Sequence, residues 1–265
     1  MVFYSPFEYY YLWLPLIGFI VGMLASMIGG GGGFFFPPLL IVLFNVPAHI
    51  AVATSLAATL PICLIGAAGH YRLGNIDVRT GLVFGIAGII GALAGASVAG
   101  WLSPEQLGKA FGIYALILGV VILFTGGRRD ENKGSIIGGL YSRLFGFIPK
   151  GSFYGFAGGV ITGTFGTSGT APVLAGLFAI KLPVKLIAGT SLMVILMNTV
   201  SGFAGHLVLG MIDLTMVWLL TAGTILGALA GPLITARFNP GRHEKTVRWV
   251  FAIFLLLFGI IMVVT

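Results

Sequence analysis

The sequence predicts an all-α polytopic membrane protein built from two inverted repeats, each with a broken, re-entrant helix and three transmembrane helices. Three observations lead to this fold class. The composition is apolar, with 58% hydrophobic and 8% charged residues and a mean hydropathy of +1.08, whereas soluble domains carry about 25% charged residues. The sequence is duplicated, and each copy contains a break of small residues within an apolar run.

The first repeat is expected to occupy residues 1–125. It begins with a broken helix over 12–44, in which Gly29–Gly33 lie between two uncharged apolar runs. Glycine lets the backbone leave the helix. Phe34–Phe36 and the two prolines that follow restart it, because proline is tolerated in a first helical turn. Unbroken helices, each near the roughly 20 residues that cross a bilayer, are expected over 47–70, 80–102 and 106–125.

The second repeat is expected to occupy residues 152–265, after a charged linker over 126–151. The linker holds the strongly charged run Arg128, Arg129, Asp130, Glu131 and Lys133. The repeat begins with a broken helix over 152–180, whose break reads Gly163 to Pro172. Helices over 186–209, 214–236 and 246–264 follow.

The two halves align without a gap when residue numbers differ by 136, as for Ser55 and Ser191. Apolar chains resemble one another by chance, but they do not share so many glycines, prolines, histidines and aspartates at one offset. The matched pairs include Pro47 with Pro183, His70 with His206, Asp77 with Asp213, Gly91 with Gly227, and Gly95 with Gly231. The sequence therefore predicts an internal duplication of the kind found in transporters.

The placement of basic residues predicts how the halves are oriented. Lys and Arg favour cytoplasmic loops, so the linker is expected to be cytoplasmic. The two arms of the second broken helix, 153–165 and 171–180, each span under about 20 Å at 1.5 Å per residue, which is too short to cross. If this element is a hairpin, the basic residues of the second half are cytoplasmic as well. Both termini then lie outside.

The two breaks are the predicted substrate site. A helix that restarts after a break presents unpaired N–H groups and a positive dipole end, which suit an anion. Paired broken helices at matching positions mark the binding site of many transporters. Hydroxyls of the second break and of the next helix in each half add neutral donors, and Asn198 lies within a span. The candidate substrate-binding residues are Gly30, Gly31, Gly32, Gly33, Phe34, Thr54, Ser55, Gly166, Thr167, Ser168, Gly169, Thr170, Thr190, Ser191 and Asn198.

A structural role is the alternative for each of these residues. Small residues let transmembrane helices approach closely, and Ser and Thr often bond back to the backbone. We expect packing for Gly22, Gly91, Gly95, Gly227 and Gly231. The Thr-Ser pairs fit either role. His70 and His206 are expected either to bond a carbonyl or to form a proton relay, and Asp77 and Asp213 are expected to be helix N-caps.

The sequence holds no motif of catalysis or of metal binding, such as HExxH or a Cys/His cluster. We therefore expect neither an enzyme nor a cofactor. The formal net charge of +7 lies in short loops between apolar spans, where it indicates orientation and not nucleic-acid binding. The spans lack Asp, Glu, Lys and Arg away from their ends. A cation pathway normally needs an intramembrane carboxylate, so a cation pump is disfavoured.

The residues described above resemble the TauE/SafE sulfite exporter family of permeases. The resemblance covers residues 12–264 and rests on Gly29–Pro38, on the paired motifs Ala53–Leu56 and Gly189–Leu192, and on the Gly-x-Ile-Asp repeats at Gly74 and Gly210. It implies a multi-pass carrier of the prokaryotic inner membrane for sulfite, organosulfonates or related sulfur-containing anions. The second break departs from the first, with Thr167 and Ser168 at the places of Gly31 and Gly32, a difference that bears on substrate choice.

The expected partners are the lipid bilayer and a small sulfur-containing anion, with no nucleic acid. Proton coupling and a homodimer stay open, as do the specific anion and the direction of transport. Two other functions fit the same sequence. One is an anion channel of this architecture, and the other is a membrane partner subunit that does not transport.

Overall fold

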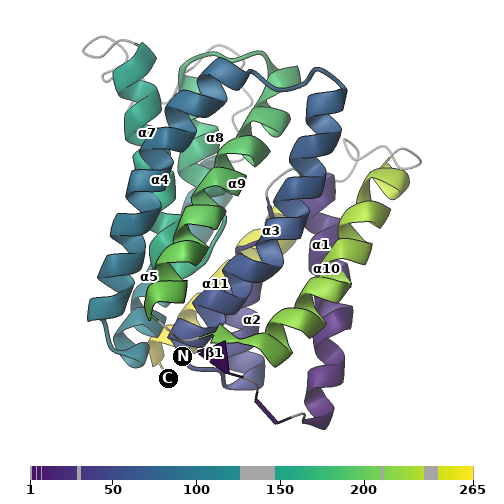
Figure 1. Ribbon diagram of the computed structural model, residues 1–265, viewed down its shortest axis with the longest axis vertical. Helices are drawn as coiled ribbons and strands as arrows, with labels where there is room; N and C mark the ends of the chain where they lie inside the picture. Colours follow the sequence, from purple (N-terminus) through teal and green to yellow (C-terminus); the bar gives the residue numbers. More distant parts are fainter. Residues whose placement is uncertain are drawn as a thin grey trace.

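The protein is a bundle of helices in which α3 (Ala48–Arg72) and α9 (Val184–Leu209) lie side by side (Figure 1). The computed structural model describes residues 2–3, 5–6, 8–28, 31–125, 147–209, 212–235 and 244–264. Within these residues all regular structure is helical except for one pairing of two short strands. The predicted all-α polytopic fold is therefore confirmed. Of the described helices, α3, α4, α5 and α9 are long and apolar enough to cross a membrane.

The helices of the first half follow the predicted order. A short 3-10 turn, η1 (Tyr9–Leu12), leads into α1, and residues 31–35, the described part of the first break, precede α2. The bounds are α1 Trp13–Ile28, α2 Phe36–Phe44, α3 Ala48–Arg72, α4 Val78–Trp101 and α5 Pro104–Thr125.

The second half repeats this order after the linker, of which residues 126–146 lie outside the described part. Residues 166–169 separate α7 from α8. The bounds are α7 Phe147–Phe165, α8 Thr170–Ala179, α9 Val184–Leu209, α10 Leu214–Thr235 and α11 Glu244–Val264.

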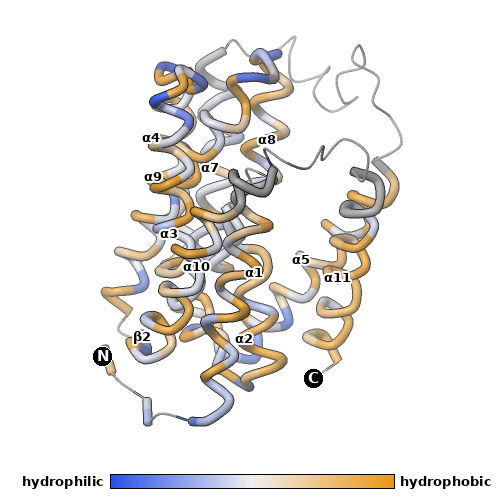
Figure 2. The backbone as a smooth tube through the Cα atoms, turned by 90° about the vertical axis from the view of Figure 1, so that its right-hand side faces the viewer, coloured by the Kyte–Doolittle hydropathy of each residue, from blue (hydrophilic) through white to orange (hydrophobic). Residues whose placement is uncertain are grey.

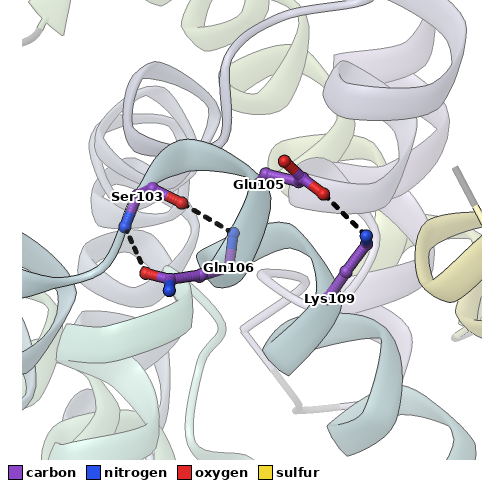
Figure 3. Close-up of polar contacts among 4 residues, drawn as sticks. All are labelled: Ser103, Glu105, Gln106 and Lys109. Carbon is purple, nitrogen blue, oxygen red and sulfur yellow. Dashed lines mark hydrogen bonds and ion pairs between the residues drawn. The ribbon is translucent and has the colours of Figure 1, made fainter.

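Local sequence explains several helix ends. Pro37 and Pro38 lie in the first turn of α2, as predicted. Asp77 is the N-cap of α4 and accepts a hydrogen bond from Thr80 N, and Asp213 accepts one from Thr215 N at the start of α10. Both predicted caps are confirmed. At the start of α5, the backbone N–H of Gln106 donates to Ser103 Oγ, and the backbone N–H of Ser103 donates to Gln106 Oε1 (Figure 3). This reciprocal pair is a capping box.

The broken helices turn back on themselves. In Figure 1, α1 begins and α2 ends at the lower end of the bundle, whereas α7 begins and α8 ends at the upper end. Strand β1 (Val2–Phe3) and the last turn of α11 lie at the lower end, called the terminus end, whereas α7, which follows the linker in the sequence, begins at the upper end, called the linker end. These helix directions are compatible with two inverted repeats, each a re-entrant hairpin followed by three crossings. The side of the membrane that each end faces stays a prediction.

The first helix of each half packs against a helix of the other half. Helix α1 packs against α10, and α7 packs against α4, which holds the place of α10 in the first half. Glycines bring these backbones together: Gly91 and Gly95 lie against the backbone of α7 at Phe156 and Val160, and Gly227 lies against α1 at Phe19. A Cβ atom on Gly22 would stand 2.7 Å from Thr224 O. Packing roles are confirmed for these four predicted glycines, while Gly231 has no described environment.

The outer faces of the bundle are apolar. Large side chains such as Ile86, Ile90, Ile117 and Ile253 expose more than half of their surface, and apolar residues cover most of the helix lengths (Figure 2). In a soluble protein such a continuous surface would aggregate. Here it is the surface that contacts lipid.

The strand pairing ties the N-terminus to the loop between α9 and α10. Strand β1 (Val2–Phe3) pairs in parallel with β2 (Ile212–Asp213). Ser5 N donates to Asp213 Oδ1, and the Thr215 hydroxyl donates to Ser5 O over 3.0 Å. No pattern in the sequence predicts this contact, which holds the start of α10 beside the N-terminal residues.

Cysteine labelling tests the orientation. Single cysteines in place of Ser103 and Val208, both exposed at the terminus end, should react with a membrane-impermeant maleimide added to intact cells. Cysteines in place of Leu73 and Lys185, exposed at the linker end, should react only after the cells are opened. The unmodified chain is the control, because its single cysteine, Cys63, is buried. Labelling of Ser103 and Val208 positions from opposite sides would contradict the inverted arrangement.

Candidate substrate-binding site

The two helix breaks touch each other inside the bundle. A Cβ atom on Gly33 would stand 2.7 Å from Ser168 N and 3.1 Å from the carbonyl carbon of Thr167. A Cβ atom on Gly31 would stand 3.1 Å from Ser168 Cβ. The backbone of the first break therefore lies directly against the backbone of the second. Segments that are more than 130 residues apart in the sequence form one place in the fold.

Glycine is required for the path of both breaks. Gly31 and Gly32 have φ values of +70° and +71°, and Gly166 and Gly169 have values of +67° and +56°. These angles lie in the left-handed region, which glycine adopts without the clash that a Cβ atom would cause. The structure thus brings together the predicted glycines of the two breaks, except Gly30, which lies outside the described residues.

Ser55 links the central helix α3 to both breaks. Its buried hydroxyl lies 2.7 Å from Gly166 O and 3.5 Å from Gly33 O, so it donates mainly to the second break. Its counterpart in the second half, Ser191, is also fully buried, but its hydroxyl has no hydrogen-bond partner among the described residues. The two equivalent serines are therefore used differently.

The threonines of the two Thr-Ser pairs lie away from the breaks or lack a partner. Thr190 Oγ1 accepts a hydrogen bond of 2.9 Å from Asp77 N, so it holds the loop that precedes α4. This contact gives Thr190 a structural role. Thr54 is fully buried, and its hydroxyl has no partner in the described part of the chain.

The second break carries three hydroxyls. Ser168 Oγ and Thr170 Oγ1 lie 2.7 Å apart and share a hydrogen bond. Thr167 is fully buried, yet its hydroxyl has no partner within the described residues. The Asn198 side chain lies nearby on α9, beside Gly88 of α4 and Gly158 of α7, and neither its oxygen nor its nitrogen is paired there. Buried polar groups without a partner are rare and often mark a place where water or a ligand binds.

The electrostatics of the breaks are set by backbone, not by charged side chains. Helices α2 and α8 begin at the two breaks, at Phe36 and Thr170. The N-terminal ends of both helices therefore point toward the place where the breaks meet, and each carries about half a positive charge. The N-cap residues of the two helices, Phe35 and Gly169, make no side-chain capping bond. The described residues of the two breaks include no Asp, Glu, Lys or Arg.

The two histidines lie at different places: His206 is bonded to the last turn before the second break, and His70 lies near the end of α3. His206 Nε2 lies 2.7 Å from Gly163 O, and because a carbonyl only accepts, Nε2 must carry the proton of this hydrogen bond. This is the carbonyl-bonding role that the sequence left open. His70 lies near the opposite end of α3, where its Cβ atom is close to Gly189. Its Nδ1 is buried without a partner among the described residues.

An aromatic layer joins the breaks to α5 and α11. The ring of Tyr114 on α5 stacks between Phe34, at 6.3 Å, and Phe165, at 5.3 Å. Phe34 follows the first break and Phe165 precedes the second. Phe251 of α11 meets the Phe34 ring edge to face at 6.1 Å. The Tyr114 hydroxyl is buried and unpaired within the described part. The predicted site residue Phe34 thus covers the breaks with an aromatic wall.

An open groove lies elsewhere, at the terminus end between α2, α5 and α11. Asn45, Pro47, Glu105, Lys109 and Met262 are among the residues that line it. Lys109 is paired with Glu105 over 2.7 Å, an exposed ion pair at the start of α5 (Figure 3). None of the predicted site residues lines this groove, so it is not the candidate site.

Comparison with known proteins gives the family. A family model described as Sulfite exporter TauE/SafE matches residues 14–262. The chain belongs to the TauE/SafE family. Two similar proteins of Bacillus subtilis are the probable membrane transporter proteins YdhB, 30% identical over 83% of this chain and 88% of the relative, and YunE, 25% identical over 93% and 94%. A third, the probable membrane transporter protein MJ0441 of Methanocaldococcus jannaschii, is 27% identical over 97% of this chain and its whole length. No solved structure matches the chain.

The family fixes the class of protein. This TauE/SafE chain is a multi-pass integral protein of the prokaryotic plasma membrane, and its relatives are named as membrane transporters and not as enzymes. The similarity covers at least 83% of this chain and at least 88% of each of these relatives. The breaks, the helices that surround them and the linker all lie within the family match over residues 14–262.

Three buried polar residues near the breaks of this TauE/SafE protein were missed by the sequence analysis. Thr59 and Thr199 lie on the central helices α3 and α9, and Tyr114 lies on α5. All three hydroxyls lack a partner in the part of the chain that the structure describes. A signal was present for the two threonines, since each falls on the same helical face as the small and apolar residues of the α3–α9 contact, at steps of three or four.

Ser55 should stabilise the contact between the breaks. Ser55→Ala would leave the buried Gly166 carbonyl without its donor, at a cost of about 1–3 kcal/mol. The variant should therefore unfold at a lower temperature in detergent than the unmodified protein. Ser97→Ala is the matched control, because Ser97 is exposed and bonds only to Leu93 O of its own helix. Equal thermal midpoints for the two variants would show that the Ser55 bond contributes nothing to the fold.

Proposed function

We propose that the protein is a secondary transporter that moves a small sulfur-containing oxyanion, such as sulfite or an organosulfonate, and binds it where the two breaks meet. The observation that carries the proposal is the contact of Gly33 with Thr167 and Ser168. Because of this contact, two helix N-termini and several neutral donors converge on one place. The family description and the names of the relatives support the transporter class, and the substrate is our inference.

The chemistry of the breaks suits an anion that must be released again. Helix N-termini and hydroxyls can donate to oxyanion oxygens. With no fixed positive side chain among the described break residues, binding relies on partial charges and on hydrogen bonds. Such a site would hold an anion weakly enough for turnover.

The absence of a full positive charge at the described breaks also favours a low charge on the substrate. Removing an ion from water costs more as its charge increases, and only about half a positive charge stands at each helix end. A compact monoanion therefore fits better than a strongly hydrated dianion. Sulfonates are monoanions, and sulfite is partly monoanionic near neutral pH. Sulfate is a dianion under the same conditions.

Flux from purified protein in liposomes tests the proposal. Sulfite or a short sulfonate should enter protein-containing vesicles faster than empty ones, and sulfate in tenfold excess should reduce that entry only slightly. Strong inhibition by sulfate would contradict the charge argument. Protein that is folded but moves none of these anions would contradict the transporter function and favour a partner subunit. Flux that follows the anion gradient alone, with no response to an imposed proton gradient, would favour a channel.

The same vesicles test whether protons are coupled through the histidines. We propose His70 and His206 as the proton carriers if coupling exists, because the described spans offer no carboxylate for this role away from their ends. Flux measured at several pH values should then lose its pH dependence in the double variant His70→Gln, His206→Gln. An unchanged pH profile in that variant would limit His206 to its bond with Gly163 O.

A further inference from the structure

The central helices α3 and α9 contact each other through one face of each. They run in opposite directions and lie side by side in the bundle (Figure 1). A Cβ atom on Gly66 of α3 would stand 3.0 Å from Leu192 Cδ1 of α9, and one on Gly202 of α9 would stand 3.6 Å from Leu56 Cδ1 of α3. These two contacts fix the register of the shared face.

The register places two threonines opposite each other. Thr59 follows Leu56 by three residues, and Thr199 precedes Gly202 by three. Each threonine lies one helical turn from a second facing pair, Cys63 of α3 and Ile195 of α9. A Cβ atom on Gly31 would stand 3.3 Å from Cys63 Sγ and 3.2 Å from Ile195 Cγ2, so these two side chains are neighbours. Since antiparallel helices keep their register over so short a distance, Thr59 and Thr199 face each other across the contact.

The second break lies at this pair of threonines. Ser55, one turn before Thr59, donates to Gly166 O. Gly202, near one turn after Thr199, lies beside Gly163, whose Cα would be 3.5 Å from a Cβ atom at Gly202. The second break is thus held between these two turns, and Thr167 follows Gly166 directly. Thr59, Thr167 and Thr199 are at most 1% exposed, and their three hydroxyls have no partner among the described residues.

The first break lies at the other pair, where apolar side chains and one serine surround it. A Cβ atom on Gly31 would stand 3.3 Å from Cys63 Sγ, 3.2 Å from Ile195 Cγ2 and 3.1 Å from the Cβ atom of Ser168, whose hydroxyl is bonded to Thr170. Gly32 is close to Ile62, with a Cβ atom at 3.4 Å from Ile62 Cδ1. At the 136-residue offset Cys63 corresponds to Thr199, Ile195 to Thr59, and Ile62 to Asn198. The duplicated site has therefore become polar at the second break and apolar at the first.

We infer that the site is divided into two subsites: Thr59, Thr167 and Thr199 bind the oxygen atoms of the anion, and Cys63, Ile62 and Ile195 contact a short apolar group attached to it. The inference rests on the proposed function and names its substrate class as short alkylsulfonates in preference to sulfite. Three unpaired buried hydroxyls can each donate to an oxygen, and a sulfonate has three equivalent oxygens. The fourth substituent on the sulfonate sulfur is the alkyl group, and we place it against the apolar side chains, which offer no hydrogen-bond donor.

The wild-type test is a competition assay. Uptake of radiolabelled sulfite into proteoliposomes is measured against sulfite, methanesulfonate and ethanesulfonate as competitors. We expect the two sulfonates to inhibit at concentrations about tenfold or more below that of unlabelled sulfite, because an alkyl group gains from apolar contact. Sulfite uptake with no advantage for either sulfonate would overturn the division into subsites and leave the proposed function intact. No uptake and no binding of any of these anions by folded protein would overturn the proposed function.

Variants assign the two subsites. Thr59→Val and Thr199→Val keep the shape of the side chain and remove one donor to a charged group, so each should weaken inhibition by every anion about tenfold to a hundredfold. Thr59→Ser restores the donor and should remain near wild type, which separates loss of the donor from misfolding. Thr221→Val is the matched control, since its buried hydroxyl is also unpaired but lies on α10. Unchanged inhibition constants in both Val variants would contradict the polar subsite.

A substitution at the other side tests the apolar subsite. Cys63→Ser makes the wall beside Gly31 more polar at nearly constant size, and it should reduce the preference for ethanesulfonate over sulfite while the protein stays folded. If the ratio of the two inhibition constants stays at its wild-type value, Cys63 does not contact the substituent and the apolar subsite is wrong. The ratio is measured within one variant, so it does not depend on how much active protein each preparation contains.

Discussion

The contact between the two breaks is the constraint on which the rest of the structure depends. Gly33 lies so close to the backbone of Thr167 and Ser168 that a side chain at that position would displace the second break. The left-handed φ angles of Gly31, Gly32, Gly166 and Gly169 let the backbone turn back at each break, where the two breaks are in contact. Helices α2 and α8 then begin there with their positive ends, and Ser55 holds the arrangement from α3 through Gly166 O. A membrane interior supplies no water to satisfy such backbone groups, so the breaks are tolerated only because the surrounding helices enclose them.

Around the breaks, the residues that pack helices together and the residues proposed to bind substrate lie on different helices. Glycines on α4 and α10, such as Gly91 and Gly227, bring the backbones of α7 and α1 into direct contact, which dispersion forces between closely packed helices stabilise. The central pair α3 and α9 instead carries buried polar groups on the faces that meet. The pair α5 and α11 meets the breaks through aromatic rings, with Tyr114 between Phe34 and Phe165. The glycine contacts of α4 and α10 thus involve none of the candidate substrate residues.

Much of the fold could be predicted from the sequence, because it depends on periodic and local signals. Apolar runs separated by charged loops gave α3 as 47–70, against the observed 48–72, and prolines and aspartates placed the starts of α2, α4 and α10. The duplication identified the breaks. The site was harder to predict, because it depends on which residues of one helix face which residues of another. Thr190 was expected at the breaks, yet it bonds to Asp77 N, and Thr59 and Thr199 were missed since only the α3–α9 register places them opposite each other. The pairing of Val2–Phe3 with Ile212–Asp213 joins distant segments and left no local signal.

The most direct test of the account is to locate a bound sulfonate. The purified protein would be crystallised with 2-bromoethanesulfonate, whose bromine marks one end of the molecule through anomalous scattering. The account predicts a single sulfonate between Gly31–Gly33 and Gly166–Thr170, with its oxygens toward Thr167 and its bromine toward Cys63. A sulfonate bound only in the groove beside Lys109 and Asn45, with the breaks in closed contact and empty, would contradict the claim that the two breaks form one anion site.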